Sequence, residues 1–91
     1  MKNNLNKTLK LFLKIADKLI HEEKIASYRQ FSRKFLRKSA NYIGALVYQN
    51  KSPSIISGFT LYQNLVSVNE LQILRNELYS TIFEQIGEKI K

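Results

Sequence analysis

The residue types that carry acid–base or metal chemistry are scarce in this chain and poorly spaced for it. The chain has one His and no Cys. His21, Glu22 and Glu23 are consecutive, so on a helix they spread over about 200° and do not converge on one ion or substrate. Glu84 and Glu88 are four residues apart, a spacing that predicts like-charge repulsion rather than a catalytic pair. We therefore expect no enzyme, cofactor, metal site or small-molecule substrate.

Basic side chains offer a different chemistry, the binding of anions. The 91 residues include 15 Lys and Arg but only seven Asp and Glu, giving a net charge of +8. Residues 1–38 carry 11 of the basic and three of the acidic residues, whereas residues 39–91 carry four of each. The whole excess therefore lies in the first two-fifths of the chain. Such clustering favours a polyanionic partner, with a general contribution to solubility as the alternative.

The length predicts a single domain covering residues 1–91. No run of about 18 apolar residues is present, so we expect no membrane-spanning helix. Met1-Lys2 and the apolar residues after it suggest a signal peptide. However, Lys10, Lys14 and Lys18 interrupt every apolar stretch, and no small-residue cleavage site follows. We expect a cytoplasmic protein.

Helical periodicity occurs five times and predicts an all-α fold. Residues 5–22 place apolar side chains on one face and lysines on the other. The apolar residues of this face are Leu5, Leu9, Phe12, Leu13, Ala16, Leu19 and Ile20. A second helix is predicted to begin at Ser27, whose hydroxyl and the side chain of Gln30 would form a reciprocal capping box. It ends near Leu36, with Tyr28, Phe31 and Phe35 pointing inward.

The third and fourth helices are joined by a loop. The third runs over about residues 40–49, with Ser39 as N-cap and Asn50 as a left-handed end. It carries no charged residue, and its apolar face consists of Ile43, Leu46 and Val47. Pro53 suits the first turn of the fourth helix, about residues 54–65. That helix is expected to place Ile55, Phe59, Tyr62 and Val66 on one apolar face, which Leu61 and Leu65 widen.

The last helix is predicted over about residues 68–90, starting from a second capping box between Ser67 and Glu70. Its length of about 33 Å exceeds what the short helices can cover. We therefore expect its apolar stripe to bind a second copy of the chain. The dimer candidates are Leu74, Leu78, Ile82, Ile86 and Ile90.

Residues 27–50 have the layout of a helix-turn-helix. Residues 28–65 resemble the DNA-binding domain of the Cro/phage-repressor type. The matching positions are Phe31-Ser32, Phe35, Ile43, Leu46, the loop Lys51-Ser52-Pro53-Ser54, Leu61 and Leu65. The chain departs from that family in the turn, where Leu36 or Arg37 replaces the usual Gly. The spacing from Phe35 to Ile43 is also one residue longer.

The resemblance implies that the third helix enters the major groove of DNA. The base-reading candidates are then Ser39, Ala40, Asn41, Gly44, Ala45, Tyr48 and Gln49. The phosphate-contact candidates are Arg29, Arg33, Arg37, Lys38 and Lys51. Asn41 suits adenine and the alanines suit thymine methyl groups, while the third helix has no Arg or Lys for guanine. The expected readout therefore favours A·T pairs.

These observations lead to a transcriptional regulator of bacterial, phage or plasmid type that binds double-stranded DNA as a homodimer. The alternative is a small phage-encoded inhibitor or adaptor that acts through protein–protein interaction, for example on a nucleic-acid enzyme. Its basis is the uncharged third helix, on which Tyr48 can serve as an anchor. RNA binding ranks third, because it requires exposed aromatic side chains.

Overall fold

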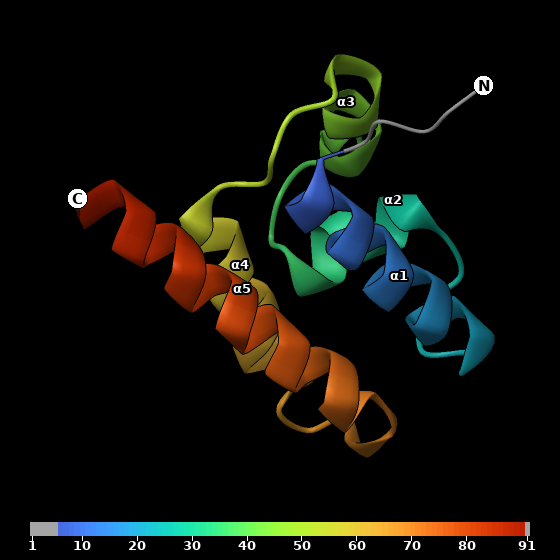
Figure 1. Cartoon of the computed structure of the whole chain (residues 1–91). Coiled ribbons are helices and arrows are strands. Elements are labelled where there is room, and N and C mark those ends of the chain that lie inside the picture. Colours follow the sequence, from blue (N-terminus) through green and yellow to red (C-terminus); the bar gives the residue numbers. More distant parts are fainter. Residues whose placement is uncertain (1–5, 91) are drawn as a thin grey trace, which may run out of the picture.

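The structure is a computed structural model that describes the backbone of residues 6–90 and the side chains of residues 6–87. The described part of the chain is all-α (Figure 1). Helix α1 (Lys7–His21) is followed by the single turn α2 (Tyr28–Gln30), which continues into a π-helical segment, η1 (Phe31–Phe35). The remaining elements are α3 (Tyr42–Gln49), α4 (Ile55–Leu65), a 3₁₀ turn, η2 (Asn69–Leu71), and α5 (Gln72–Ile90). The predicted all-α fold of five helices with a long C-terminal helix is confirmed.

Helix α1 contributes most to the core. Its buried apolar residues are Leu9, Leu11, Phe12, Ile15, Ala16 and Leu19. The side chain of Asn6 caps the helix by accepting hydrogen bonds from the backbone N–H groups of Thr8 (2.8 Å) and Leu9 (3.2 Å). Helix α1 therefore begins at Lys7; the predicted start at Leu5 lies outside the described residues.

Helices α4 and α5 form an antiparallel pair. A Cβ atom built on Gly58 would lie 3.0 Å from the Ile82 side chain, while Tyr62 contacts Tyr79 with ring centroids 5.6 Å apart. The two helices approach closely only because position 58 has no side chain. Gly58, Leu61 and Leu65 consequently face inward. The predicted face of α4 is confirmed for the buried Leu61 and Leu65 and for Ile55 and Tyr62, which pack against the core. It is wrong for Phe59 and Val66, which are exposed.

Helix α5 packs its apolar stripe into the core of its own chain. Leu78 and Ile82 are buried, and Leu74 and Ile86 pack against the same core. The assignment of this stripe to a partner is therefore corrected, because α1 and α4 already cover it; the side chain of Ile90 lies outside the described residues.

The start of the last helix also differs from the prediction. The 3₁₀ turn η2 has Val68 as its N-cap and no side-chain capping hydrogen bond, so the expected Ser67–Glu70 capping box does not form. Instead, the Glu70 carboxylate lies 3.8 Å from the Lys24 ammonium. Pro53 lies one residue before the N-cap of α4, Ser54, rather than in its first turn.

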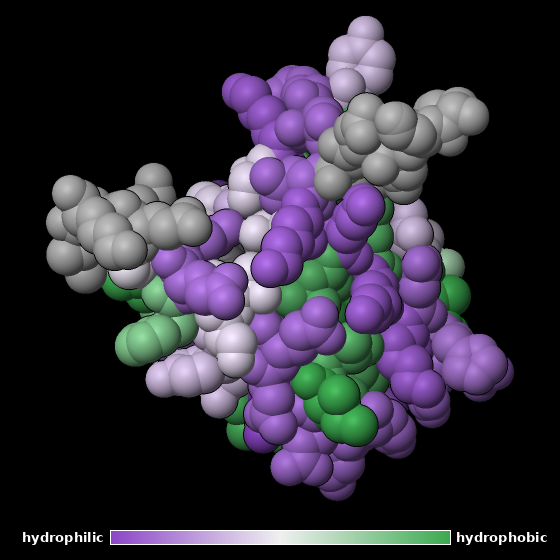
Figure 2. Space-filling model, in the orientation of Figure 1, coloured by the Kyte–Doolittle hydropathy of each residue, from purple (hydrophilic) through white to green (hydrophobic). Residues whose placement is uncertain are grey.

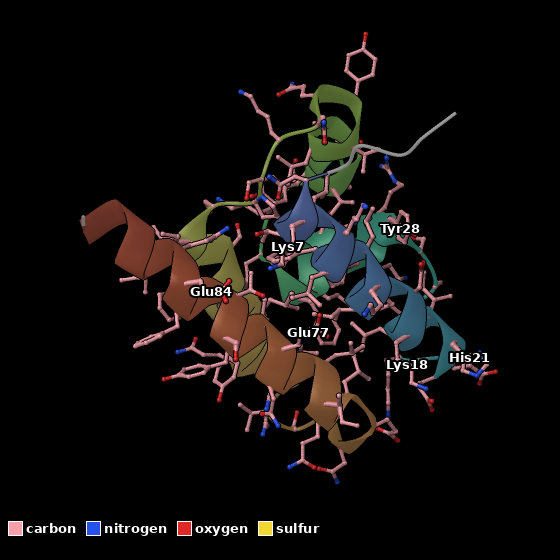
Figure 3. All side chains as sticks on the ribbon, in the orientation of Figure 1. Lys7, Lys18, His21, Tyr28, Glu77 and Glu84 are labelled. Atoms are coloured by element: carbon pink, nitrogen blue, oxygen red, sulfur yellow. The ribbon has the colours of Figure 1, made fainter. Side chains whose placement is uncertain are left out.

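Ion pairs connect α1 to α5. The Lys7 ammonium lies 3.9 Å from the Glu84 carboxylate (Figure 3), and that of Lys14 lies 3.8 Å from the Glu77 carboxylate.

The surface is mixed in character. Figure 2 shows hydrophobic side chains reaching the surface between flanking hydrophilic ones. Within residues 6–90, no helix combines the length and apolarity that crossing a membrane requires.

Candidate nucleic-acid interface

The segment before α3 begins with a side-chain cap. The Ser27 hydroxyl accepts a hydrogen bond from the Gln30 backbone N–H (3.2 Å), as predicted. The Gln30 side chain, however, accepts from the N–H of Ala26 (2.8 Å) rather than from that of Ser27. The reciprocal cap therefore spans one more residue than expected.

Tyr28 does not point inward, contrary to the prediction. Its ring is exposed, and its hydroxyl donates a hydrogen bond to the Asp17 carboxylate at 2.6 Å. This hydrogen bond, partial burial and the negative charge of Asp17 raise the pKa of Tyr28 to about 12. Figure 3 shows Tyr28 beside α1. The contact fixes the start of α2 against α1.

The turn between η1 and α3 depends on a left-handed residue. Arg37 has φ 59°, and the following N–H, that of Lys38, donates to the Ser32 carbonyl at 2.9 Å. Glycine adopts this conformation most easily. Arg37 thus takes a conformation typical of glycine, and the chain turns without a glycine.

Ser32 joins the two halves of this unit. Its side chain is fully buried, and its hydroxyl accepts a hydrogen bond from the Ile43 backbone N–H at 3.2 Å. The same hydroxyl donates to the Tyr28 carbonyl at 3.2 Å. The hydroxyl of Ser32 therefore caps α3, and the small side chain lets α3 approach η1.

Helix α3 starts later than predicted and ends where predicted. Its N-cap is Asn41, because the Ser39 carbonyl accepts the Tyr42 N–H (3.1 Å) in the turn before the helix. Asn50 ends the helix in the left-handed conformation. The Tyr42 hydroxyl lies 3.0 Å from the Ser57 hydroxyl and connects α3 to α4.

An open groove of about 420 Å³ lies between α2 and α3. The residues that line it are Tyr28, Arg29, Ala40, Asn41, Gly44, Ala45, Tyr48 and Gln49. Six of the seven base-reading candidates are therefore together, whereas the exposed Ser39 lies outside the lining. Arg29 donates to the Asn41 side-chain oxygen at 2.9 Å, and Tyr48 is 91% exposed.

Basic side chains without acidic sequence neighbours precede and follow α3, which lines this groove. Residues 24–69 contain no Asp or Glu. Exposed basic side chains follow the segment from α2 to the loop before α4, and we call them the basic rim: Arg29, Arg33, Lys34, Arg37, Lys38 and Lys51. In the described part of the chain, none of the six forms an ion pair, because the carboxylates of Glu70, Glu77 and Glu84 are close to lysines in or just after α1.

Lys34 is the member of the basic rim that sequence reasoning missed. It lines a second hollow with Gln30 and Arg33. Its position directly after Arg33 is a signal that could have identified it. Lys38 differs from the others because its ammonium lies 5.4 Å from the centre of the Tyr42 ring.

The residues considered for acid–base chemistry remain separate. His21 ends α1 and is exposed, Glu22 pairs with Lys18 at 3.2 Å, and Glu23 adopts a left-handed conformation with φ 62°. Among the described residues, no three His, Asp or Glu side chains lie close enough to hold a metal ion.

The chain belongs to a family described as "Family of unknown function (DUF6626)", whose profile matches residues 12–88. This match covers the last two-thirds of α1, every element from α2 to η2, and α5 up to residue 88. No curated protein and no solved structure matches the chain.

Proposed function

We propose that this member of a family of unknown function binds duplex DNA with α3 and the basic rim, as a small transcriptional regulator of bacterial, phage or plasmid type. The observation that carries the proposal is a set of six exposed cations, none of them in an ion pair, on the segments directly before and after the uncharged helix α3. Lys and Arg that release counterions from phosphates provide most of the affinity of such proteins for DNA. Acidic side chains close to this surface would oppose binding; residues 24–69 have none, and the Asp17 carboxylate accepts a hydrogen bond from the Tyr28 hydroxyl.

The shape of α3 supports insertion into the major groove. This helix projects from the body of the molecule (Figure 1), and only Ile43 and Leu46 are buried in the core. A helix about 10–12 Å wide fits the major groove, which is about 12 Å wide. The exposed positions include Gly44 and Ala45, whose small size permits close approach to base edges.

In this proposal, Asn41 is the residue that recognises a base by hydrogen bonds. Its side-chain oxygen accepts a hydrogen bond from Arg29 but has two lone pairs, and its NH₂ group retains both donors. The amide is thus held in one orientation and can still pair with adenine. Arg29 acts as a positioning residue, while Ala40 and Ala45 provide apolar contacts for thymine methyl groups. The proposed preference is for A·T-containing sites.

The proposal also rests on the resemblance to the Cro/phage-repressor type. At the small position of the second helix this chain has Ser32, which is buried, and in the turn it has Arg37 in the left-handed conformation. The spacing between Phe35 and Ile43 remains one residue longer than in that family.

The direct test is fluorescence anisotropy with a labelled mixed-sequence duplex at about 50 and about 200 mM salt. Six phosphate contacts predict that affinity falls about 10³-fold over this range. The same-length single strand is the control ligand and is expected to bind more weakly, because it has no major groove. Absence of duplex binding at the lower salt concentration would contradict the proposal.

A protein target is the second candidate, and one observation favours it. Tyr48 is 91% exposed beside a groove lined mainly by small and apolar residues. Exposed Tyr side chains commonly anchor protein interfaces. Tyr48→Ala distinguishes the two functions, because it removes no positive charge. A protein interface predicts a large loss of partner binding, whereas the salt dependence of DNA binding is expected to remain unchanged.

A further inference from the structure

A group of aromatic and apolar side chains lies on the outer side of the α4–α5 pair, away from the core. We call it the aromatic face, and it consists of Phe59, Tyr62, Val66, Tyr79 and Phe83. Tyr79 contacts Tyr62 at 5.6 Å and stacks on Phe83 at 6.2 Å between ring centroids. Tyr79 is nevertheless 51% exposed and Phe83 67% exposed.

The aromatic face is preorganised. The rings of Tyr62, Tyr79 and Phe83 already contact one another, so covering them costs less side-chain entropy than ordering free side chains would. Tyr62 is also held by Arg75, whose guanidinium lies 5.7 Å from its ring. Exposed apolar surface that is concentrated in one place commonly marks an interaction site.

The distribution of charge favours a second copy as the occupant. The chain carries +8, so two copies that met through α1, α2 or the basic rim would place Lys and Arg against Lys and Arg. Helix α4 contains no charged residue, and residues 39–91 have as many acidic as basic residues. Arg75 is the cation at the aromatic face, where it lies over the Tyr62 ring, so two copies that meet through α4 and α5 bring together less positive charge than at the basic surfaces.

We propose that the aromatic face binds a second copy of this chain about a two-fold axis, giving a symmetric dimer. Antiparallel helices present the same surface to each other after a two-fold rotation, as an isologous interface requires. This proposal does not depend on DNA binding. The proposed interface is this exposed surface, and no longer the apolar stripe of α5 that the sequence suggested, because that stripe is buried.

The available area sets the expected strength. Aromatic side chains cover about 150–250 Å² each, so the exposed parts of Phe59, Val66, Tyr79 and Phe83 provide on the order of 400 Å² per copy. Polar neighbours such as Gln63 and Ser80 extend the contact area towards the roughly 800 Å² per partner of a standard interface. The dimer is therefore expected to dissociate in the micromolar range.

Sedimentation equilibrium of the full chain without DNA, from about 5 to about 500 μM, tests this proposal. The mass is expected to rise from that of the 10.7 kDa monomer to twice that value. Phe83→Glu brings two carboxylates together across the axis and is expected to weaken dimerisation at least 10-fold. Phe83→Ser is a milder variant that keeps the test valid if the charged variant fails to fold.

Ile73→Glu is the matched control. Ile73 is 82% exposed on α5 but outside the aromatic face, so the same substitution there is expected to leave the dimer intact. A wild-type chain that stays monomeric over the whole concentration range would overturn the proposal. Equal weakening by Phe83→Glu and Ile73→Glu would overturn it too. Because no DNA is present, either result leaves the proposed DNA binding to be decided by its own experiment.

Discussion

The hydroxyl of Ser32 accepts the backbone N–H of Ile43 at 3.2 Å, and this one hydrogen bond connects the helix before the turn to the helix after it. Ser32 is fully buried, so water cannot replace the bond if it is lost. The position of α3 relative to the basic rim therefore depends on a small polar side chain in the preceding element.

Ser32→Ala tests this connection. The substitution keeps the side chain small but leaves the buried Ile43 N–H without its acceptor, which is expected to cost about 1–2 kcal/mol of unfolding free energy. Urea denaturation measures the loss. Ser80→Ala, on the exposed surface of α5, is the control and is expected to change stability by less than about 0.5 kcal/mol. Equal effects of the two substitutions would refute a special role for Ser32.

Arg37→Gly separates backbone strain from charge. Arg37 has φ 59°, a conformation that costs a non-glycine residue about 1 kcal/mol. The variant is therefore expected to gain about 1 kcal/mol in stability, and yet to bind DNA more weakly because it lacks one cation of the basic rim. Thermal unfolding and anisotropy measure the two effects.

Glu23→Gly is the matched control for that experiment. Glu23 has φ 62°, so the same gain in stability is expected. This substitution removes a negative charge, and DNA affinity should not fall. If both glycine variants weaken DNA binding alike, the effect of Arg37→Gly does not come from a lost phosphate contact.

Two of the helical glycines, Gly58 and Gly44, should respond oppositely to alanine. At Gly44 a Cβ atom has open space, so Ala is expected to stabilise α3 by about 0.5–1 kcal/mol. At Gly58 the Cβ atom would lie 3.0 Å from the buried Ile82 side chain, so Ala is expected to destabilise the α4–α5 pair. Thermal unfolding of the two variants measures both; stabilisation at both positions would show that α4 and α5 do not pack this closely.

The hydrogen bond between Tyr28 and Asp17 predicts an alkaline loss of stability. The pKa of Tyr28 is about 12 in the folded chain against about 10 when unfolded, so its contribution is complete below about pH 10. The contribution is lost as the pH rises from about 10 to 12. Comparison of wild type with Tyr28→Phe by urea denaturation at about pH 8 and about pH 11 should show a smaller difference at the higher pH, where about half of the contribution is lost. Tyr48→Phe, which removes an exposed hydroxyl, should follow wild type at both.

Helix number and most of the core were predictable because the apolar periodicity of α1 and the capping role of Ser27 are local properties. The buried face of α4 was not, because Phe59 and Leu61 are similarly apolar and only the close approach at Gly58 selects one of them. The first residue of α3 was missed for a comparable reason. Ser39 is a good N-cap by type, but the cap comes from Ser32, in the preceding element.

The residues of the candidate site were easier to place than their contacts. The resemblance to the Cro/phage-repressor type implied Asn41, Gly44, Ala45 and Tyr48 as candidates on the third helix, and the structure places all of them along one groove. The ion pairs that leave the basic rim uncompensated depend on the distant α5. Spacing along the chain cannot predict an ion pair between distant helices, such as that of Lys14 with Glu77.

Two double variants of equal charge test the central claim most directly. Arg33→Ala/Arg37→Ala removes two cations of the basic rim, whereas Lys7→Ala/Lys14→Ala removes two cations that face carboxylates of α5. The measurement is the slope of log affinity for a duplex against log salt concentration. We predict that the first variant flattens the slope by about 2 and the second leaves it almost unchanged. Equal slopes for the two variants would show that net charge, and not the surface around α3, holds the DNA, and would contradict this account.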